Sequence, residues 1–417
     1  MNKLYIRNAT DIHGRQVDCS MGRSHGDVTV APAGSLNIPQ GATRIIDASG
    51  KILLPAFFDL HATIEIHGRS KRESVSRAGQ AALNGGVWGM LVMPSPGFMF
   101  DNYATLDSFN DAVSQRSATE MYAAGCISVG MEGLQQAPYN TMAARGVSIL
   151  TDAGRMPASL LMLHRAMKYA GELGMVFAIR GDVPELSRNT WMNTGATSYR
   201  LGLHGTPACA EEIGIETLLR LAADAGARVH VQTVSTAEGA DIIRRAKARG
   251  VKVTAEVALH HLLYTDECVG DYDTNFKTLP PLRTQRDVDA LIAAVKDGTI
   301  DCIVSDHRPC TPFSKKQDFI SAPQGMVSLD TFLPTLYTKL IRPGKLSWEE
   351  VVRACSENPC RIADPRDPEM DTELQPPLML FDPEASFTVS ETHLSCGTLN
   401  TPLLGSTLCG AVTLPLQ

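Results

Sequence analysis

The sequence has no apolar run near the roughly 20 residues that a membrane-spanning helix requires. Its first residues, MNKLYIRNATDIHG, lack the apolar core and the small-residue cleavage site of a secretory signal peptide. Low-complexity segments are missing as well. These absences predict a cytoplasmic protein that does not associate with membranes.

Closely spaced cysteine pairs and an excess of positive charge are also missing. The ten cysteines include no CxxC pair, which excludes zinc knuckles and disulfide scaffolds and predicts reduced, mostly buried thiols. Thirty-eight Lys and Arg residues stand against 45 Asp and Glu, a formal net charge of −7. Because no basic field is available to hold a polyanion, we expect no nucleic-acid partner.

What the sequence does contain is an alternation of short β-branched runs with helical patterns from residue 52 onward. This alternation is typical of βα units around a parallel sheet. Eight runs can be counted, at residues 52–61, 87–93, 121–129, 147–152, 175–180, 228–234, 251–257 and 301–307. Eight units predict an α/β fold, a (β/α)8 TIM barrel over residues 52–368. A capping box at Ser347 opens one of the extra helices expected after the last run.

The two ends of the chain have a different pattern. Residues 1–51 and 369–417 contain short alternating segments broken by Gly, Pro and Ser, with no helical period. Neither end could bury a core alone. Since chain ends often lie close together, we expect one small composite β-domain built from both termini.

In a barrel of this kind, function lies at the carboxyl ends of the strands. The first run ends in Asp59, His61 and Thr63, which share one face because side chains alternate along a strand. The other strand ends with polar or otherwise informative residues lie at Asp152, Ile179–Arg180, Thr233 and Asp306–His307.

Several segments around these positions resemble dihydroorotases of the amidohydrolase superfamily. They occur in the family's order over nearly the whole chain: LPAFFDLHAT (54–63), GGVWGMLVMPSP (85–96), TDAG (151–154), VHVQTVST (229–236), VKVTAEVALHHLLYT (251–265), LPPLR (279–283), DCIVSDHRPC (301–310) and FDPEASFTV (381–389). The resemblance implies an amidohydrolase-type barrel and a zinc-dependent hydrolase that opens or closes the dihydroorotate ring in pyrimidine synthesis.

The residues depart from the metal centre that this resemblance implies. The vestigial family positions His61, Asp152 and Asp306 are kept. Three of the four family histidines are replaced, by Thr63, Ile179 and Thr233, and neither Ile nor a neutral Thr hydroxyl substitutes for an imidazole ligand. A catalytic metal lowers the pKa of bound water from 15.7 to about 7, so its loss removes on the order of 12 kcal/mol of activation. We therefore expect no cofactor, no bound metal and no catalytic residue.

The substrate-binding positions implied by the resemblance have changed too. Glu65 stands where the family has an Arg for the substrate carboxylate, and reversing that charge shifts the interaction by roughly 8 kcal/mol at 4 Å and an effective dielectric of about 20. Ser95 and Leu279 replace two Asn residues, and Cys310 replaces a His. The sequence therefore predicts that the substrate is not bound at these positions.

The remaining polar residues allow one other kind of site. A mononuclear site from His61, Asp152 and Asp306 would satisfy a minimal ligand count and suit Mg or Mn better than Zn. Against it, Arg308 places a cation beside Asp306, and we expect Arg308 to neutralise Glu65, Asp152 and Asp306. We expect His61 to hydrogen-bond Asp306 or Asp152. The remaining residues considered are assigned structural roles: His230, His260, His261, His67 and the Cys310 thiol.

A barrel without a metal can still act through its surface. The resemblance extends to a branch of inactive dihydroorotase homologues that associate with aspartate carbamoyltransferase, which predicts a noncatalytic structural subunit in a homo- or hetero-oligomer. The alternative is an active metal-dependent cyclic amidohydrolase with an altered, reduced metal site. The loop of Phe98, Met99 and Phe100 either plugs the empty pocket or forms a docking patch, and we expect it to plug the pocket.

Overall fold

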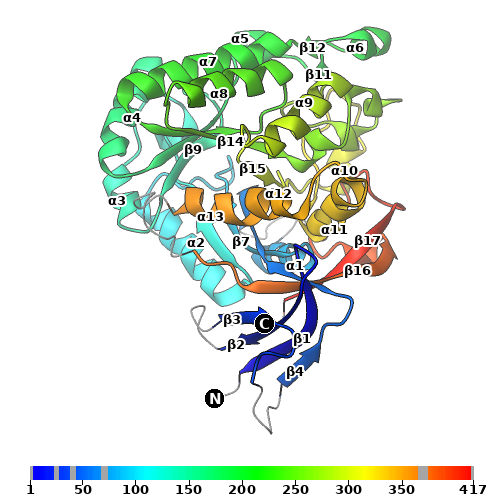
Figure 1. The fold of residues 1–417 in the computed structure, drawn as a ribbon. Coiled ribbons are helices and arrows are strands. Elements are labelled where there is room, and N and C mark those ends of the chain that lie inside the picture. The colour runs from blue at the N-terminus through cyan, green and yellow to red at the C-terminus, as the bar shows by residue number, and fades with distance from the viewer. Residues whose placement is uncertain (1–2, 23–27, 38–43, 67–73, 365–373, 415–417) are drawn as a thin grey trace.

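Eight parallel strands form a barrel at the centre of the molecule in the computed structural model, which describes residues 3–22, 28–37, 44–66, 74–364 and 374–414 (Figure 1). In chain order the barrel strands are β6 (Phe57–Ala62), β7 (Val87–Val92), β8 (Glu120–Ala123), β9 (Ile149–Gly154), β10 (Val176–Arg180), β13 (Arg228–Gln232), β14 (Val253–Ala258) and β15 (Cys302–Val304). They are short, apolar and almost wholly buried, as expected for parallel strands covered on both faces.

The barrel is closed by two contacts between a three-stranded and a five-stranded sheet. The first sheet has the order β6-β7-β8 and the second β15-β14-β13-β10-β9. Parallel bridges join Ala62 to His307 and Gly125 to Leu150, so each edge of one sheet meets an edge of the other. The (β/α)8 barrel predicted from the sequence is thus confirmed, and its eight strands lie within a few residues of the eight runs.

Helices surround the barrel because each presents one apolar face to the strands. Side-chain caps begin several of them, such as Ser74 for the first and Thr236 for α8. The surrounding helices are α1 (Val75–Asn84), α2 (Tyr103–Arg116), α3 (Tyr139–Ala143), α4 (Leu160–Glu172), α7 (Ala208–Ala225), α8 (Ala237–Ala248) and α9 (Gln285–Lys296). After β15 follow α10 (Pro312–Lys315), α11 (Phe332–Leu336), α12 (Trp348–Val352) and α13 (Asn358–Ala363), and the capping box at Ser347 is present.

Short elements decorate the mouth of the barrel between β10 and α7. They are α5 (Pro184–Ser187), β11 (Met192–Asn193), α6 (Ala196–Leu201) and β12 (Gly205–Thr206). The two strands form their own parallel pair. This excursion carries polar side chains to the carboxyl end of β10.

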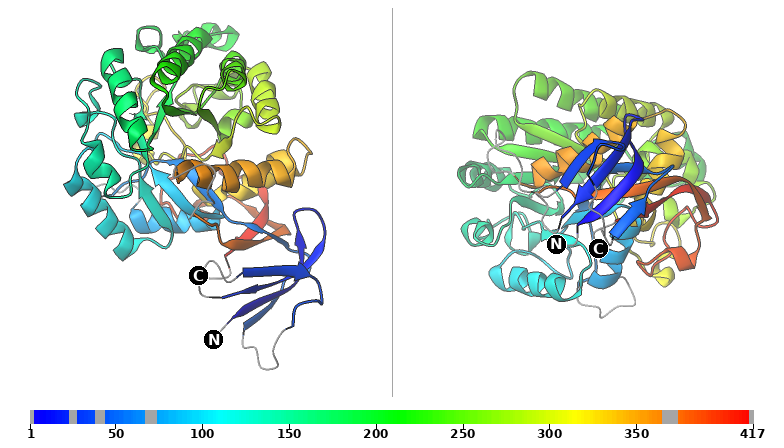
Figure 2. Two further views of the ribbon diagram at one scale, coloured as in Figure 1. Left: turned by 60° about the vertical axis from the view of Figure 1, so that its left-hand side comes forward. Right: turned by 60° about the horizontal axis from the view of Figure 1, so that its bottom comes forward.

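Both ends of the chain contribute to one further sheet beside the barrel (Figure 2). Its strands are β1 (Leu4–Asp11), β2 (Gln16–Met21), β3 (Val28–Pro32), β4 (Arg44–Asp47), β5 (Ile52–Pro55), β16 (Leu378–Thr388) and β17 (Thr407–Thr413). A small separate core lies on it, with Leu4, Ile6 and Leu380 among its members. The terminal β-domain predicted from the sequence is present.

The first expected strand, residues 52–61, is wrong in one respect. It is two strands, since β5 pairs with β1 and β16 in the terminal sheet and the barrel begins only at Phe57. A continuous apolar run hides this break, because both halves are buried. The other predicted boundary, 368–369, lies outside the described residues.

None of the helices in the described ranges has the length and apolar character that crossing a bilayer requires.

Candidate functional site

The polar side chains at the mouth of the barrel come from the ends of its strands, as the fold requires. Three non-glycine residues there, Ala153, Thr233 and Asp306, adopt positive φ angles of 54°, 45° and 43°. Such left-handed backbone is costly and clusters at functional sites. The strand ends therefore keep a strained geometry that aims side chains into the mouth.

His61 is held by a buried carboxylate that the sequence analysis did not identify. Its Nδ1 lies 2.5 Å from Oε1 of Glu256 on β14, and the other oxygen, Oε2, lies 3.0 Å from Nε2 of His230. All three side chains are buried. Glu256 thus bridges two imidazoles, and the expected hydrogen bond of His61 to Asp306 or Asp152 is wrong.

The charge of this cluster follows from its geometry. Burial alone would raise the pKa of Glu256, but the two imidazoles outweigh it and hold the pKa at about 2. Burial would lower the pKa of His61, but the charge and hydrogen bond of Glu256 outweigh it and raise that pKa above its ordinary value. Both shifts therefore favour the charged form of each group.

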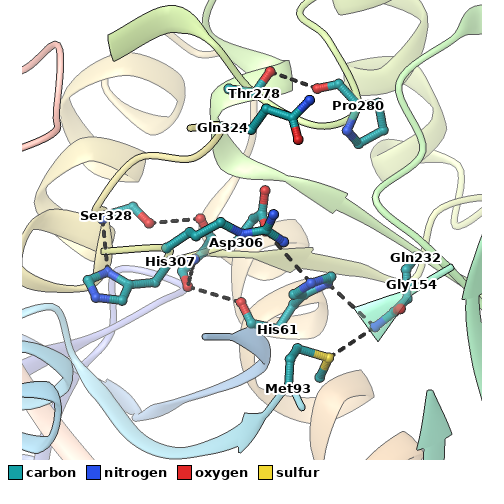
Figure 3. Close-up of polar contacts among 12 residues, drawn as sticks. His61, Met93, Gly154, Gln232, Thr278, Pro280, Asp306, His307, Gln324 and Ser328 are labelled. Carbon is teal, nitrogen blue, oxygen red and sulfur yellow. Dashed lines mark hydrogen bonds and ion pairs between the residues drawn. The ribbon is translucent and has the colours of Figure 1, made fainter. Parts of the chain in front are cut away.

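Gln232 and Met93 fill the space on one side of His61 (Figure 3). The Gln232 amide accepts a hydrogen bond from Thr151 Oγ1 at 3.1 Å and approaches Met93 Sδ at 3.4 Å. Its nitrogen lies 3.5 Å from His61 Nδ1, whose proton is already donated to Glu256. The ring of His61 is fixed on this side by packing.

Asp306 faces the other side of the same ring, and its contacts are loose. Its carboxylate lies 3.6 Å from His61 Nε2, 3.7 Å from His260 Nε2 and 3.9 Å from Arg308 Nη2. These separations are too long for hydrogen bonds. Arg308 still lies beside Asp306, as predicted, but it forms no hydrogen bond with that carboxylate.

Asp152 has a different set of partners. Its carboxylate accepts hydrogen bonds from the backbone N–H of Ser128 at 3.0 Å and from the Ser128 hydroxyl. Burial raises its pKa, and these hydrogen bonds offset part of that shift. The prediction that Arg308 neutralises Asp152 is not supported by these contacts, because Ser128 satisfies the carboxylate. That Arg308 neutralises Glu65 stays a prediction.

The three residues that replace family histidines offer no imidazole nitrogen to a metal. Thr63 donates its backbone N–H to the carbonyl of His307, and Ile179 is fully buried. Thr233 is buried, and within the described chain its hydroxyl has no hydrogen-bond partner. Among the described residues, no three His, Cys, Asp or Glu side chains converge on a point where a metal ion could be held.

The residues present do not fit the family's zinc. A catalytic zinc takes three protein ligands. Of the four family histidines only His61 is kept, and Thr63, Ile179 and Thr233 offer no imidazole nitrogen. The mononuclear set of His61, Asp152 and Asp306 is not assembled either, since Asp152 is bound to Ser128.

The four altered substrate positions have different structural environments. Glu65 is half-buried, Ser95 closes a tight turn with Phe98 through two backbone hydrogen bonds of 2.9 and 3.0 Å, and Leu279 lines a cavity at the mouth. Cys310 is buried, and its backbone N–H donates to Asn400. The predicted buried thiol is confirmed in its placement.

The remaining histidines differ from one another. His261 contacts the carbonyl of Pro280 through Nε2 at 3.2 Å, whereas neither ring nitrogen of His260 has a hydrogen-bond partner in the described chain. Burial lowers the pKa of both, that of His261 to about 4. His230 contacts Glu256 and so belongs to the same buried cluster as His61, and His67 lies outside the described residues.

The loop after β7 packs into the protein. Phe100 is fully buried, and its ring packs edge-on against the ring of Phe109 on α2, with ring centroids 5.0 Å apart. The ring centroid of Phe98 lies 5.4 Å from that of Phe100. Phe100 is therefore a core residue, and neither a pocket plug nor a docking patch describes it.

Comparisons with known proteins agree with the architecture. A family model described as dihydro-orotase-like matches residues 50–239. A dihydroorotase of Pelotomaculum thermopropionicum is 36% identical over 384 residues, which cover 92% of this chain and 90% of the relative. A dihydroorotase of Mycobacterium leprae is 35% identical over 407 residues, with 97% and 94% covered.

Solved structures share the fold at low sequence identity. The L-hydantoinase (dihydropyrimidinase) of Arthrobacter aurescens has a TM-score of 0.81 at 21% identity, covering all of this chain and 96% of its own. The dihydropyrimidinase of Brevibacillus agri NCHU1002 has a TM-score of 0.78 at 20% identity, with 99% and 94% covered. These likenesses confirm the amidohydrolase-type barrel with its separate β-domain.

Proposed function

Because this chain belongs to the dihydroorotase family, we propose that it keeps the family's barrel without the family's metal-assisted hydrolysis. The predicted family is therefore confirmed, and the loss of catalysis is the step that we add.

One observation carries the proposal: among the described residues, no three His, Cys, Asp or Glu side chains converge on a point that could hold a metal ion. His61 is the single family imidazole kept, and a catalytic zinc takes three protein ligands. Without a metal, general-base catalysis contributes only about 10²–10⁴-fold, so Asp306 alone cannot replace it.

We extend the proposal to a noncatalytic structural role. The partner is aspartate carbamoyltransferase, in a homo- or hetero-oligomeric assembly, and this assignment rests on the resemblance to inactive homologues that bind that enzyme. We place the assembly in the cytoplasm.

The second candidate function is an active dihydroorotase with a reduced metal site. The relatives from Pelotomaculum thermopropionicum and Mycobacterium leprae favour it, since both are called dihydroorotase and are 35–36% identical to this chain. The altered positions Thr63, Ile179 and Thr233 oppose it. The two candidates differ in whether the protein holds a divalent ion.

Metal content tests the proposal. The protein purified from its own cells without chelators is expected to contain far less than one equivalent of zinc, manganese or magnesium. About one or two equivalents bound with His61 as a ligand would favour the second candidate.

Association is tested separately. Mixed with the aspartate carbamoyltransferase of the same organism, the protein is expected to elute from a sizing column as a larger complex than either alone. Elution of two separate species at micromolar concentration would contradict the structural role.

A further inference from the structure

A polar cavity of about 250 Å³ lies at the barrel mouth, on the side of β10. Arg180 at the end of β10, the segment of Thr278 and Pro280, and Gln324 line it. Figure 3 shows Thr278, Pro280 and Gln324 close together above the His61 region. At about 30 Å³ for each liquid water molecule, the cavity could hold about eight waters or one small organic molecule.

Arg180 is the unusual member of this lining. Its side chain is 94% buried, being 6% exposed. Within the described chain, the guanidinium of Arg180 forms no hydrogen bond and no ion pair with another residue. None of its nitrogen atoms is among the fully enclosed unpartnered atoms. The guanidinium therefore uses its small exposed area to face the cavity.

Gly154 makes room for this guanidinium. A Cβ built at Gly154 would lie 3.4 Å from Arg180 Nη1, and the φ angle of Gly154 is 77°. A side chain at this position would be strained and would press on the guanidinium. The local backbone thus permits the placement of Arg180 over the end of β9.

The carboxylates around the cavity are already occupied. Asp182 accepts a hydrogen bond from Ser187 Oγ at 3.0 Å. Glu211 accepts hydrogen bonds from the backbone and hydroxyl groups of Ser235 and Thr236, and Arg283 lies 3.8 Å away. Neither carboxylate forms an ion pair with Arg180. Asp182, Asp306, Glu211 and the like-charged Arg308 all act on Arg180 from a distance, and burial lowers its pKa without removing its charge.

A buried guanidinium without a partner is unfavourable, and a carboxylate is the ligand that best matches its fork. We propose that this cavity binds a small organic acid, whose carboxylate pairs with Arg180. A singly charged carboxylate suits the site better than a phosphate dianion, because Asp182 and Glu211 also line the cavity. Arg180 is not one of the substrate contacts that the family resemblance implies, and the proposal holds whether or not the barrel is catalytic.

Butyrate, a singly charged carboxylate, is the probe for a binding test. Its addition is expected to raise the Tm of the wild-type protein in a saturable way, with a Kd of about 1 mM, whereas the neutral analogue butyramide has no effect. R180Q is expected to bind butyrate about 10- to 100-fold more weakly, the effect of losing a charge-assisted hydrogen bond. The matched control is R220Q, since Arg220 is exposed and pairs with Glu216 on α7.

R180K keeps the charge and loses the fork, so an intermediate affinity is expected. It also carries the test if R180Q does not fold. The proposal is overturned if the wild-type protein does not bind butyrate, if R180Q or R180K binds it as tightly as the wild type, or if phosphate binds more tightly than butyrate. None of these outcomes bears on the metal content, so the proposed loss of hydrolysis stands or falls separately.

Discussion

At the scale of single residues, Glu256 determines the state of the site. It is buried in the middle of an apolar strand and bridges His61 and His230. A charged residue within the run VKVTAEVAL could have drawn attention to this position, because a buried carboxylate needs a partner. The sequence does not show which partner, since His61 is 195 positions away along the chain.

Replacing this carboxylate tests the cluster. E256Q is expected to destabilise the protein by about 3–5 kcal/mol, because both imidazoles lose their charged partner in the interior. Urea unfolding measures the change. The control is E238Q, since the pair of Glu238 and Arg286 is exposed and worth about 0–1 kcal/mol. Equal effects of the two substitutions would contradict a buried ion pair.

The same cluster makes stability depend on pH. The folded pKa of Glu256 lies near 2, below its ordinary 4.5, so its contribution is full above about pH 4.5 and is lost as the pH falls toward 2. The raised pKa of His61 gives a contribution that is full below its ordinary 6.5 and is lost as the pH rises through the folded value. The stability difference between wild type and E256Q is therefore expected to be largest between about pH 4.5 and 6.5. A difference that stays constant from pH 3 to pH 9 would be inconsistent with the ion pair.

At the scale of elements, the sequence predicts the barrel strands well, since period and capping are local properties. The capping box at Ser347 appears as expected. The break between β5 and β6 does not follow from the sequence, because burial on both sides gives one unbroken apolar run. The packing of Phe100 does not follow either, since a loop position does not reveal that α2 covers it.

The loop after β7 offers a test at this scale. F100S is expected to destabilise the protein by about 3–5 kcal/mol, because a fully buried ring that packs on Phe109 is removed. Thermal and urea unfolding give the value. F313S serves as the control, since Phe313 is 79% exposed and its loss is expected to be nearly neutral. If F100S left stability unchanged but abolished binding to aspartate carbamoyltransferase, the loop would be a docking surface.

At the scale of the whole molecule, the fold and the site have diverged in what they retain. The barrel and its terminal sheet match solved amidohydrolases over nearly the whole chain at about 20% identity. The sequence predicts this architecture because its patterns are spread over the chain. It also predicts which family histidines are missing. The pairing of His61 with Glu256 cannot be predicted in this way, because it joins strands that are distant in the sequence.

The most direct measurement of the central claim is the rate of dihydroorotate ring opening by the purified protein, with and without added zinc. We expect no turnover above the uncatalysed rate in either condition, and no protection of activity or stability by zinc. Ring opening that appears with zinc, disappears with a chelator and is lost in His61→Ala would contradict the claim and establish an active enzyme.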